Sequence, residues 1–454
     1  MVFDVVVVGA GGTGLCAALA ANDSGAQVLV LERDPTPLGS TAMSTGLIPA
    51  CGTPEQAVAG IEDSAERFAA DIRAKTKGAI DEDIVALVTG ESAETVRWMR
   101  DDHGVPLSLM DGWLYPGHSA RRMYGTPNRS GGELMAALES AASSAEIPVL
   151  TEATVTALYV DDGLVNGVRV ERPGGETEDI GCGALVPACS GFGGNADLVA
   201  RHIPEMTGAT YHGHPGNRGD AIVWGEALGA QVADIAAYQG HGGLAAGHGV
   251  PILWPAIMEG GFQVNLDGHR FSDESAGYSE QAALVNAQPR QLAWYVMDRR
   301  GYELMCEFDD FREALRAGAV VEAAGEAELA KRTGVPEQAL AKSFAQVRAA
   351  NSGKATDPFG RDFTGKPALA PPYYAARVTG ALFHTQGGLA INRDAQVLRR
   401  DGSAFANLFA GGGAARGISG SGAAGYLAGN GLLTATTLGR IAGQGAAAYA
   451  KLGG

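Results

Sequence analysis

The sequence has few cysteines and few basic residues. The first shortage argues against a disulfide-bonded protein, and the second argues against a nucleic-acid-binding protein. Only five cysteines occur in 454 residues, and none forms a C-x-x-C pair. This pattern favours reduced thiols and a cytoplasmic protein over a disulfide framework. Lysine and arginine number 34 against 51 acidic residues, which gives a net charge of −17. We therefore expect no nucleic acid among the partners, because few cations are present to neutralise phosphates.

Several other signals are missing. No apolar run reaches the length of about 18 residues that a membrane helix needs, and no basic leader precedes the first strand. The histidines show neither H-x-x-H nor H-E-x-x-H spacing, and no serine stands in a G-x-S-x-G turn. We expect a protein without a membrane span, a signal peptide, a metal site or a serine nucleophile.

Glycine, in contrast, is abundant, and the most specific pattern of the chain lies around its first glycines. The segment DVVVVGAGGTGLCAALAANDSGAQVLVLER contains a buried strand, G-x-G-x-x-G, a small-residue helix and a second strand that ends at Glu32. Gly9 suits the tight turn, Gly11 admits a pyrophosphate, and Gly14 lets the helix pack on the strand. The helix N-terminus favours phosphate, and Glu32 can accept hydrogen bonds from a ribose. The combination predicts a dinucleotide site rather than a chance glycine turn.

Later segments favour FAD over NAD as that dinucleotide. A loop rich in glycine, serine and threonine, RDPTPLGSTAMSTGLIPACGT, follows the acidic residue. The segment TEATVTALYVDDGLVNGVRVE reads as a β-meander with a turn at residues 161–163, and strands lead into glycine loops at 191–194 and 411–413. A helix is expected from about Asn430, and its N-terminus would stabilise negative charge on a flavin.

The expected fold class is α/β: a Rossmann-like FAD-binding domain with an inserted α+β cap domain. Residues 1–237 and 356–454 are assigned to the FAD-binding domain, and residues 238–355 to the cap. A helix is expected after Thr53, which suits an N-cap because proline follows it. In the cap, GFQVNLDGHRFSDE suggests a hairpin with its turn at residues 267–268.

The chain resembles the soluble branch of the fumarate reductase and succinate dehydrogenase flavoprotein family. The similarity covers essentially the whole chain and rests on the segments VVVVGAGGTGLCAALAA, GSTAMSTG, GHRFSDE, FHTQGGLAIN and GNGLLTATTLGRIAG. It implies a flavin held between a nucleotide domain and a mobile cap, with hydride passing between flavin N5 and a substrate carbon. The histidine that attaches FAD covalently in membrane-bound members is absent from GSTAMSTG, so we expect non-covalent FAD.

The resemblance, together with the motifs above, predicts the residues that contact the cofactor. They are Gly9, Gly11, Gly12, Thr13, Gly14, Glu32, Arg33, Gly39, Ser40, Thr41, Ser44, Thr45, Gly46, Thr154, Val155, Ser190, Gly191, Asp220, Gly387, Gly412, Gly413, Asn430, Leu432 and Leu433.

Four positions are predicted to be catalytic. His241 in YQGHGG and His384 in FHTQGG match two histidines of the family. Tyr278 matches the position of a cap arginine that delivers a proton, and Tyr426 in GYLAGNG matches an arginine that clamps a substrate carboxylate. Phenols do not replace guanidinium charges, and a phenol suits a neutral ketone whose oxygen accepts a hydrogen bond.

These exchanges favour a desaturase of a cyclic ketone. In this hypothesis Tyr426 and the backbone at Gly429 hold the carbonyl, and Tyr278 removes the α proton. The β hydrogen leaves as hydride to flavin N5, and an external electron acceptor reoxidises the flavin. The motif GYLAG is similar to GYxSG of 3-ketosteroid dehydrogenases of the Δ4-(5α) type. Ala428 replaces its serine, which favours a smaller ketone such as 4-oxocyclohexanecarboxylate.

Alternatives to the desaturase remain open. One is an enoate reductase of the fumarate or urocanate reductase kind, which would need an arginine acid in the cap, so Tyr278 argues against it. Another is a flavin-binding protein without turnover. A loop rich in aromatic and basic residues adds candidates for contact with substrate, although such arginines often face solvent instead. These candidates, with one arginine near the C-terminal helix, are Tyr115, Arg121, Arg122, Tyr124 and Arg416.

Overall fold

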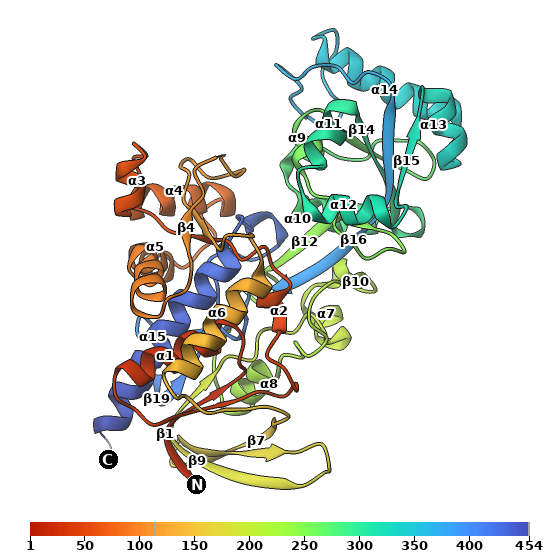
Figure 1. Cartoon of the computed structure of the whole chain (residues 1–454). Helices are drawn as coiled ribbons and strands as arrows, with labels where there is room; N and C mark the ends of the chain where they lie inside the picture. Colours follow the sequence, from red (N-terminus) through yellow and green to blue (C-terminus); the bar gives the residue numbers. More distant parts are fainter. Residues whose placement is uncertain (113, 453–454) are drawn as a thin grey trace. The chain divides into compact units, whose positions relative to one another are not determined.

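The computed structural model describes residues 1–112 and 114–452, and its fold divides into two compact units (Figure 1). The first unit comprises Met1–Leu198, Gly213–Tyr238 and the chain from His384 onward. The second unit comprises Val199–His212 and Gln239–Phe383. The mixed helix and sheet architecture agrees with the expected α/β class. The second unit continues to residue 383, beyond the cap boundary placed at 355 from the sequence.

The first unit is built on an eight-stranded sheet whose main path runs β18-β19-β9-β1-β2-β6. At its centre, β1 (Val2–Val8) pairs in parallel with β2 (Val28–Leu31) and with β9 (Thr177–Pro187). Residues 5–8 are buried, as a continuous apolar run predicts, and α1 and α15 both pack against the strand. The remaining strands are β6 (Val149–Leu150), β7 (Thr154–Asp161), β8 (Leu164–Glu171), β18 (Gln396–Leu398) and β19 (Ala404–Phe409).

Two helices from opposite ends of the sequence, α1 (Gly12–Asp23) and α15 (Asn430–Leu452), lie side by side in this unit (Figure 1). Glycines make the close approach possible: a Cβ at Gly443 would stand 2.0 Å from the Ala17 carbonyl oxygen. The predicted start of the last helix at Asn430 is therefore confirmed.

Shorter elements complete the first unit. Its other strands are β3 (Ile48–Pro49), β4 (Ser108–Leu109) and β5 (Met123–Gly125), which form one small sheet, and β11 (Val232–Ala233) with β17 (Gly388–Leu389). Its other helices are α2 (Gly39–Ala42), α3 (Pro54–Val58), α4 (Ala65–Thr76), α5 (Glu82–Arg97), η1 (Trp98–Asp102), α6 (Gly131–Ser144), α8 (Asp220–Ala227), η5 (Gly412–Ala414) and η6 (Ala423–Gly425). The capping box that Thr53 forms with Gln56 starts α3, as the sequence predicts.

The second unit is organised by one long strand, β16 (Tyr373–Thr385). It pairs with β10 (Thr210–Tyr211), β12 (Tyr238–Ala245), β14 (Leu292–Asp298) and β15 (Val320–Ala323), while β13 (Phe262–Asn265) pairs with β14. The helices here are α9 (Pro255–Met258), η3 (Glu274–Ala276), α10 (Tyr278–Asn286), η4 (Pro289–Gln291), α11 (Arg299–Met305), α12 (Asp309–Arg316), α13 (Glu326–Thr333) and α14 (Glu337–Asn351). Helix α7 (Ala196–His202) contains the point in the sequence where the first unit ends and the second begins, and η2 (Pro204–Met206) follows it in the second unit.

The hairpin expected around residues 267–268 forms only its turn. Gly268 has φ +84° and the Asn265 N–H bonds to the carbonyl of His269, but no return strand follows. The side chain of Arg270, just after this turn, is buried in ion pairs with Glu274 and Asp357. In the part of the chain that the structure describes, no helix combines the length and apolarity needed to cross a membrane.

Candidate active site

The glycine turn after β1 satisfies the steric demands of a dinucleotide turn. Gly9 has φ +103°, and a Cβ there would stand 2.7 Å from the Ala188 carbonyl oxygen. A Cβ at Gly14 would meet the Gly9 carbonyl oxygen at 1.8 Å, so only glycine fits at this place. The Gly12 N–H donates to Thr41 Oγ1 at 3.1 Å, which ties the turn to the loop after β2. The start of α1 is thus held open for a phosphate.

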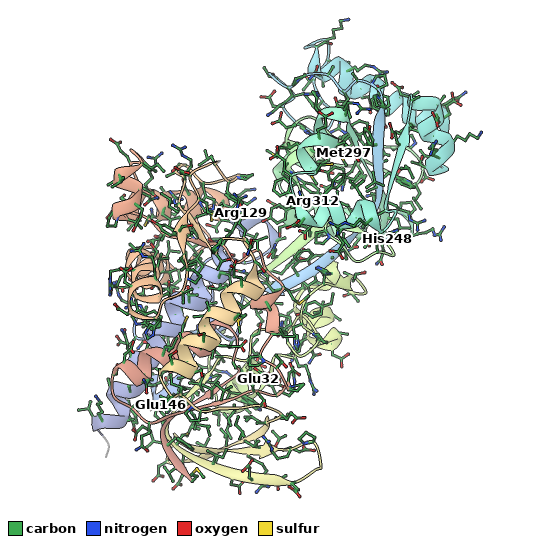
Figure 2. All side chains as sticks on the ribbon, in the orientation of Figure 1. Glu32, Arg129, Glu146, His248, Met297 and Arg312 are labelled. Atoms are coloured by element: carbon green, nitrogen blue, oxygen red, sulfur yellow. The ribbon has the colours of Figure 1, made fainter. Side chains whose placement is uncertain are left out.

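Glu32 follows β2, and its carboxylate is fixed beside the same turn (Figure 2). One oxygen accepts the Ala10 N–H at 2.8 Å and the other accepts the Asp34 N–H at 3.0 Å. A carboxylate has lone pairs for about four hydrogen bonds, so two remain for ribose hydroxyls. The neighbouring Arg33 donates to the Gly216 carbonyl at 2.9 Å and so braces this edge.

The loop that contains α2 is ordered by serine and threonine side chains. Ser44 Oγ donates to the Thr41 carbonyl at 2.7 Å and accepts the Gly46 N–H at 3.1 Å. Ser40 Oγ accepts from Asn217 at 2.6 Å, a partner that the sequence did not suggest. Gly39 begins α2, and Thr45 lies in the same loop.

Predicted cofactor residues from three distant parts of the chain meet at the glycine loops. A Cβ at Gly412 would stand 2.2 Å from Thr13 Oγ1, and one at Gly413 would stand 2.7 Å from the Gly191 nitrogen. Ser190 has a left-handed φ of +64° beside them. The other predicted positions lie at element starts or in nearby turns: Thr154 and Val155 in β7, Asp220 in α8, Gly387 before β17, and Leu432 and Leu433 in α15.

The N-terminus of α15 presents an unsatisfied acceptor. Asn430 is fully buried, and its Oδ1 has no hydrogen-bond partner within residues 1–112 and 114–452. Gly429, with φ +84°, packs so tightly that a Cβ would stand 2.6 Å from Pro49 Cδ. A buried orphan acceptor at a helix N-terminus, where the helix dipole is positive, fits a ring that carries both donors and acceptors. The residues present therefore fit an isoalloxazine.

His384 and Tyr426, both predicted to be catalytic, lie together beside this helix start. Their rings are 5.8 Å apart in an edge-to-face arrangement. A Cβ at Gly431 would stand 3.0 Å from His384 Cε1, so a larger residue at this position would press on the imidazole. Burial lowers the pKa of His384 to about 4, which keeps its ring neutral near pH 7.

A chain of side chains that sequence reasoning missed sets the tautomer of His384. Asn430 donates to Ser419 Oγ, Ser419 donates to Gln386 Oε1 at 2.7 Å, and Gln386 Nε2 donates to His384 Nδ1 at 3.1 Å. The carbonyl oxygen of Thr385 also lies 3.5 Å from Nδ1, but the contact with Gln386 is shorter, so we assign Nδ1 as an acceptor; Nε2 then carries the proton and can donate it to a ligand. The only sequence signal for Gln386 is its place in FHTQGG, and Ser419 carries none.

The second unit holds its own group of predicted residues. His241 in β12 stacks on Phe383, with ring centroids 5.2 Å apart and 14° between the planes. The ring of Tyr278, at the start of α10, lies 5.2 Å from that of His241. The Gly243 N–H donates to His241 Nδ1 at 3.0 Å, so Nε2 carries the proton. Burial, reinforced by the nearby His212, lowers the pKa of His241 to about 3, so this imidazole is also neutral.

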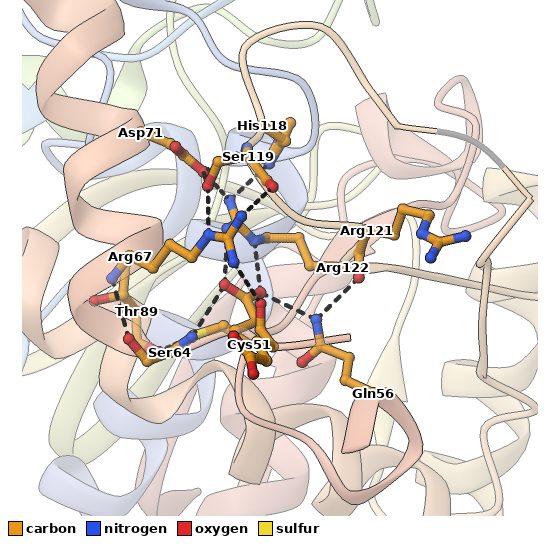
Figure 3. A network of polar contacts seen from close by, with 12 residues as sticks. Cys51, Gln56, Ser64, Arg67, Asp71, Thr89, His118, Ser119, Arg121 and Arg122 are labelled. Carbon is orange, nitrogen blue, oxygen red and sulfur yellow. Dashed lines mark hydrogen bonds and ion pairs between the residues drawn. The ribbon is translucent and has the colours of Figure 1, made fainter. Parts of the chain in front are cut away.

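The predicted substrate arginines are already engaged by protein groups. Arg122 is 1% exposed and forms ion pairs with Asp63 and Asp71 (Figure 3). Arg416 pairs with two aspartates, at residues 81 and 234. Arg121 donates to the Asp111 carbonyl at 2.8 Å. Each of these three guanidinium groups, predicted as a possible contact with substrate, thus already bonds to protein groups.

The two tyrosines of the same loop differ in their surroundings. Tyr124 is buried and donates its hydroxyl to Thr53 Oγ1 at 2.6 Å. Burial raises the pKa of Tyr124 above its ordinary value. Tyr115 is half-buried, and its carbonyl accepts the N–H of His118. Tyr124 is therefore a structural residue rather than a substrate contact.

The fold and the flavin-shaped features of the first unit define a flavoprotein, and comparison with known proteins gives its family. Residues 4–432 match the model of the FAD binding domain family, so the chain belongs to this family. It is an FAD-dependent oxidoreductase of the group that acts on CH–CH bonds. A probable fumarate reductase, Ifc3, from Shewanella frigidimarina is 32% identical, covering 98% of this chain and 75% of that protein. A urocanate reductase from Eggerthella lenta is 28% identical over 98% of this chain and 75% of its own length.

Solved structures give the same placement. The open conformation of a flavocytochrome c3 fumarate reductase is 29% identical with a TM-score of 0.84, covering 99% of this chain and 78% of that one. A 3-ketosteroid-Δ4-(5α)-dehydrogenase from Rhodococcus jostii is 25% identical with a TM-score of 0.79, covering 98% and 97%. The resemblance stated from the sequence is confirmed.

The main functional prediction is wrong. A desaturase of cyclic ketones is contradicted by relatives that match nearly the whole chain at 28–32% identity and are named as fumarate and urocanate reductases. The comparisons favour the alternative, an enoate reductase. The physical reason is that a phenol donates a hydrogen bond to a carboxylate oxygen as well as to a ketone oxygen. Replacing arginine by tyrosine therefore does not by itself identify a ketone substrate.

Proposed function

We propose that this protein is an FAD-dependent enoate reductase, which reduces a C=C bond conjugated to a carboxylate or a similar carbonyl group. The observation that carries the proposal is the pair of neutral donors, His384 and Tyr426, beside the N-terminus of α15. The names of the relatives at 28–32% identity support the reductive direction. The external partner is then an electron donor rather than the acceptor that a desaturase would need.

The first unit would hold the cofactor through residues described above. Glu32 would bind the ribose, the turn from Gly9 to Gly14 the pyrophosphate, and Asn430 the flavin ring. When bound, FAD accepts two electrons from the external donor and supplies the hydride for the C=C bond.

His384 and Tyr426 would activate the substrate. Both side chains can donate a hydrogen bond to the same carbonyl or carboxylate oxygen, which draws electron density from the C=C bond and makes its β carbon electrophilic. Because the imidazole is neutral, it donates without offering a competing acidic proton. A hydrogen bond to developing negative charge contributes about 1.5–3 kcal/mol, which corresponds to roughly 10- to 150-fold in rate.

Tyr278 in the second unit is proposed as the acid that protonates the α carbon. The sequence reading took its phenol as an obstacle to enoate reduction, because relatives place an arginine there. Acid strength argues the other way: a typical phenol has a pKa of about 10, whereas a guanidinium exceeds about 12, so the phenol gives up its proton more readily. The imidazole of His241 beside it is neutral and adds no charge next to the phenol.

We further propose that the substrate carries one activating carboxylate rather than two. A second carboxylate buried without a cation would cost several kcal/mol. Arg122 and Arg416, two of the predicted substrate contacts, are each paired with two aspartates. A 2-enoate with an apolar or aromatic substituent, such as cinnamate or urocanate, therefore suits the site better than fumarate.

The proposal is tested by anaerobic reoxidation of the dithionite-reduced holoprotein. Fumarate, acrylate, urocanate and cinnamate are added in turn, and the return of oxidised-flavin absorbance is followed. We expect at least one monocarboxylate to reoxidise the flavin faster than fumarate does. Tyr278→Phe and Tyr426→Phe should slow this step by about 10-fold or more. Tyr449→Phe, on α15 but near the other end of the helix, is the matched control and should match the wild type.

Two results would contradict the proposal. One is a flavin that an artificial dye reoxidises but no enoate does. The other is a set of Tyr278→Phe and Tyr426→Phe rates equal to those of Tyr449→Phe, which would separate the phenols from the reaction.

A further inference from the structure

A buried histidine that the proposed reaction does not use lies behind the loop that carries Tyr426. His118 is 5% exposed and belongs to the first unit. Its Nδ1 lies 3.1 Å from Arg122 Nη1, and its Nε2 lies 3.0 Å from the carbonyl oxygen of Ala428 (Figure 3 shows the side of His118 that faces Arg122). Ala428 is two residues after Tyr426 and two before the start of α15.

The two contacts allow only one arrangement of the imidazole. An arginine N–H is always a donor, so His118 Nδ1 must accept. Nε2 therefore carries the proton and donates it to the Ala428 carbonyl. His118 thus accepts a hydrogen bond from Arg122 through Nδ1 and donates one to the Ala428 carbonyl through Nε2.

The guanidinium on the other side of His118 is rigidly held. Arg122 bonds to both oxygens of Asp63 at 2.9 and 2.8 Å and to Asp71 at 2.6 Å. Its Cζ stands 4.3 Å over the ring of Phe68. Figure 3 shows Arg122 between His118 and Asp71, whose carboxylate also accepts the N–H of Ser119. Phe68 and Asp71 lie on α4, Asp63 precedes this helix, and Arg122 directly precedes β5, so the residues that hold the guanidinium belong to segments outside the glycine loop.

The loop on the receiving side needs such an anchor. Residues 420–431 read GSGAAGYLAGNG, and Gly420 and Gly429 both have left-handed φ values, of +66° and +84°. Glycine loses more backbone conformational entropy on folding than any other residue. Ordering a loop of this composition therefore has a large entropic cost. A buried carbonyl without a donor would add to that cost.

We propose that His118 is a positioning residue, which fixes the Ala428 carbonyl and thereby holds Tyr426 in place for the reaction. Its effect on rate rests on the proposed function, because it acts through Tyr426. Its effect on the loop does not depend on any substrate and can be measured independently.

The test compares three variants of the full-length holoprotein. His118→Phe keeps the volume of the ring but removes both hydrogen bonds. His118→Gln keeps an oxygen for Arg122 and an N–H for Ala428. His103→Gln is the control, because His103 also lies in the first unit and pairs with a carboxylate, that of Asp23. Flavin absorbance per protein is recorded for each, to show that FAD remains bound.

Hydrogen–deuterium exchange of the peptide that spans 417–432 is the first readout. We expect His118→Phe to speed exchange in this peptide by about tenfold, which equals about 1.4 kcal/mol, while exchange in β1 stays unchanged. His118→Gln should restore most of the protection, and His103→Gln should match the wild type. Wild-type exchange in His118→Phe would overturn the proposal.

A double-mutant cycle with Tyr426→Phe is the second readout. If His118 acts through Tyr426, His118→Phe lowers kcat for the best enoate in the wild type but has little further effect on Tyr426→Phe. Equal and additive losses would overturn the positioning role. If no enoate is reduced by any form, the proposed function fails, while the exchange experiment still decides whether His118 anchors the loop.

Discussion

Acid should destabilise the first unit through His118, and the size of the effect follows from its surroundings. Burial, together with the charge of Arg122, lowers the pKa of His118 from 6.5 to about 4, although the carboxylates of Asp71 and Asp63 oppose the shift. In the unfolded chain the imidazole titrates near its ordinary value. Between the two pKa values the unfolded state binds more protons, so stability falls as the pH drops from about 6.5 to about 4.

The magnitude is about 3 kcal/mol, because the pKa difference is about 2.5 and each pKa unit corresponds to 1.36 kcal/mol. Above about pH 6.5 the imidazole is neutral in both states, and this contribution is constant. The loss of stability has a simple cause. In a protonated ring Nδ1 would carry an N–H that points at the guanidinium of Arg122, and it could no longer accept the hydrogen bond from that group.

Urea unfolding of wild type and His118→Gln, measured in steps from about pH 7.5 to about pH 4, isolates the effect. Glutamine does not titrate, and every other group is common to both proteins. The difference in unfolding free energy should therefore shift by about 3 kcal/mol in favour of the variant, all of it below about pH 6.5. Parallel curves for the two proteins would refute the assignment of a buried, neutral imidazole to His118.

Three further substitutions test the first unit. Gly14→Ala should abolish FAD binding, because its Cβ would stand 1.8 Å from a backbone oxygen of the same turn; a flavin content equal to wild type would contradict this. Arg416→Gln should lower the unfolding free energy by about 1–3 kcal/mol and leave KM for a monocarboxylic enoate within about twofold. A KM raised tenfold or more would instead make the arginine a substrate ligand. Gly431→Ala should keep FAD but lower kcat by about tenfold, since its Cβ would press on His384 at 3.0 Å, and an unchanged kcat would count against that histidine.

The parts of the fold that the sequence predicted are those governed by local sterics. The strand, glycine turn and helix around Gly9 and Gly14 form as expected, because no other residue fits their backbone. The N-cap at Thr53 and the start of α15 at Asn430 are likewise set by neighbours a few residues away.

The parts that the sequence did not predict depend on long-range pairing. The second unit continues to residue 383 because β16 pairs with β10, β12, β14 and β15. The local sequence of a strand does not indicate which strands it pairs with, so it does not indicate the unit to which the strand belongs. The ion pair of Arg270, just after Gly268, was missed for a similar reason, since its partner Asp357 lies 87 residues away in sequence.

The same limit applies to the site. The motifs named His384 and Tyr426, and the structure brings them together. His118 was not nominated, because its partner at Ala428 lies 310 residues away. The ion pairs of Arg122, which the sequence offered as a possible substrate contact, were missed for the same reason: its two aspartates lie 59 and 51 residues away and cannot be paired with it from sequence alone.

The wrong functional prediction came from treating two tyrosines as a statement about substrate charge. A side chain in this position contributes a donor and an acid, and a phenol supplies both, with a lower typical pKa than a guanidinium. What a phenol cannot supply is a permanent positive charge. The predicted exchange of arginine for tyrosine at residues 278 and 426 therefore bears on how many carboxylates the substrate carries, and it leaves the direction of hydride transfer undecided. That direction depends on the redox potential of the bound flavin relative to its external partner, which the identity of these two residues does not determine.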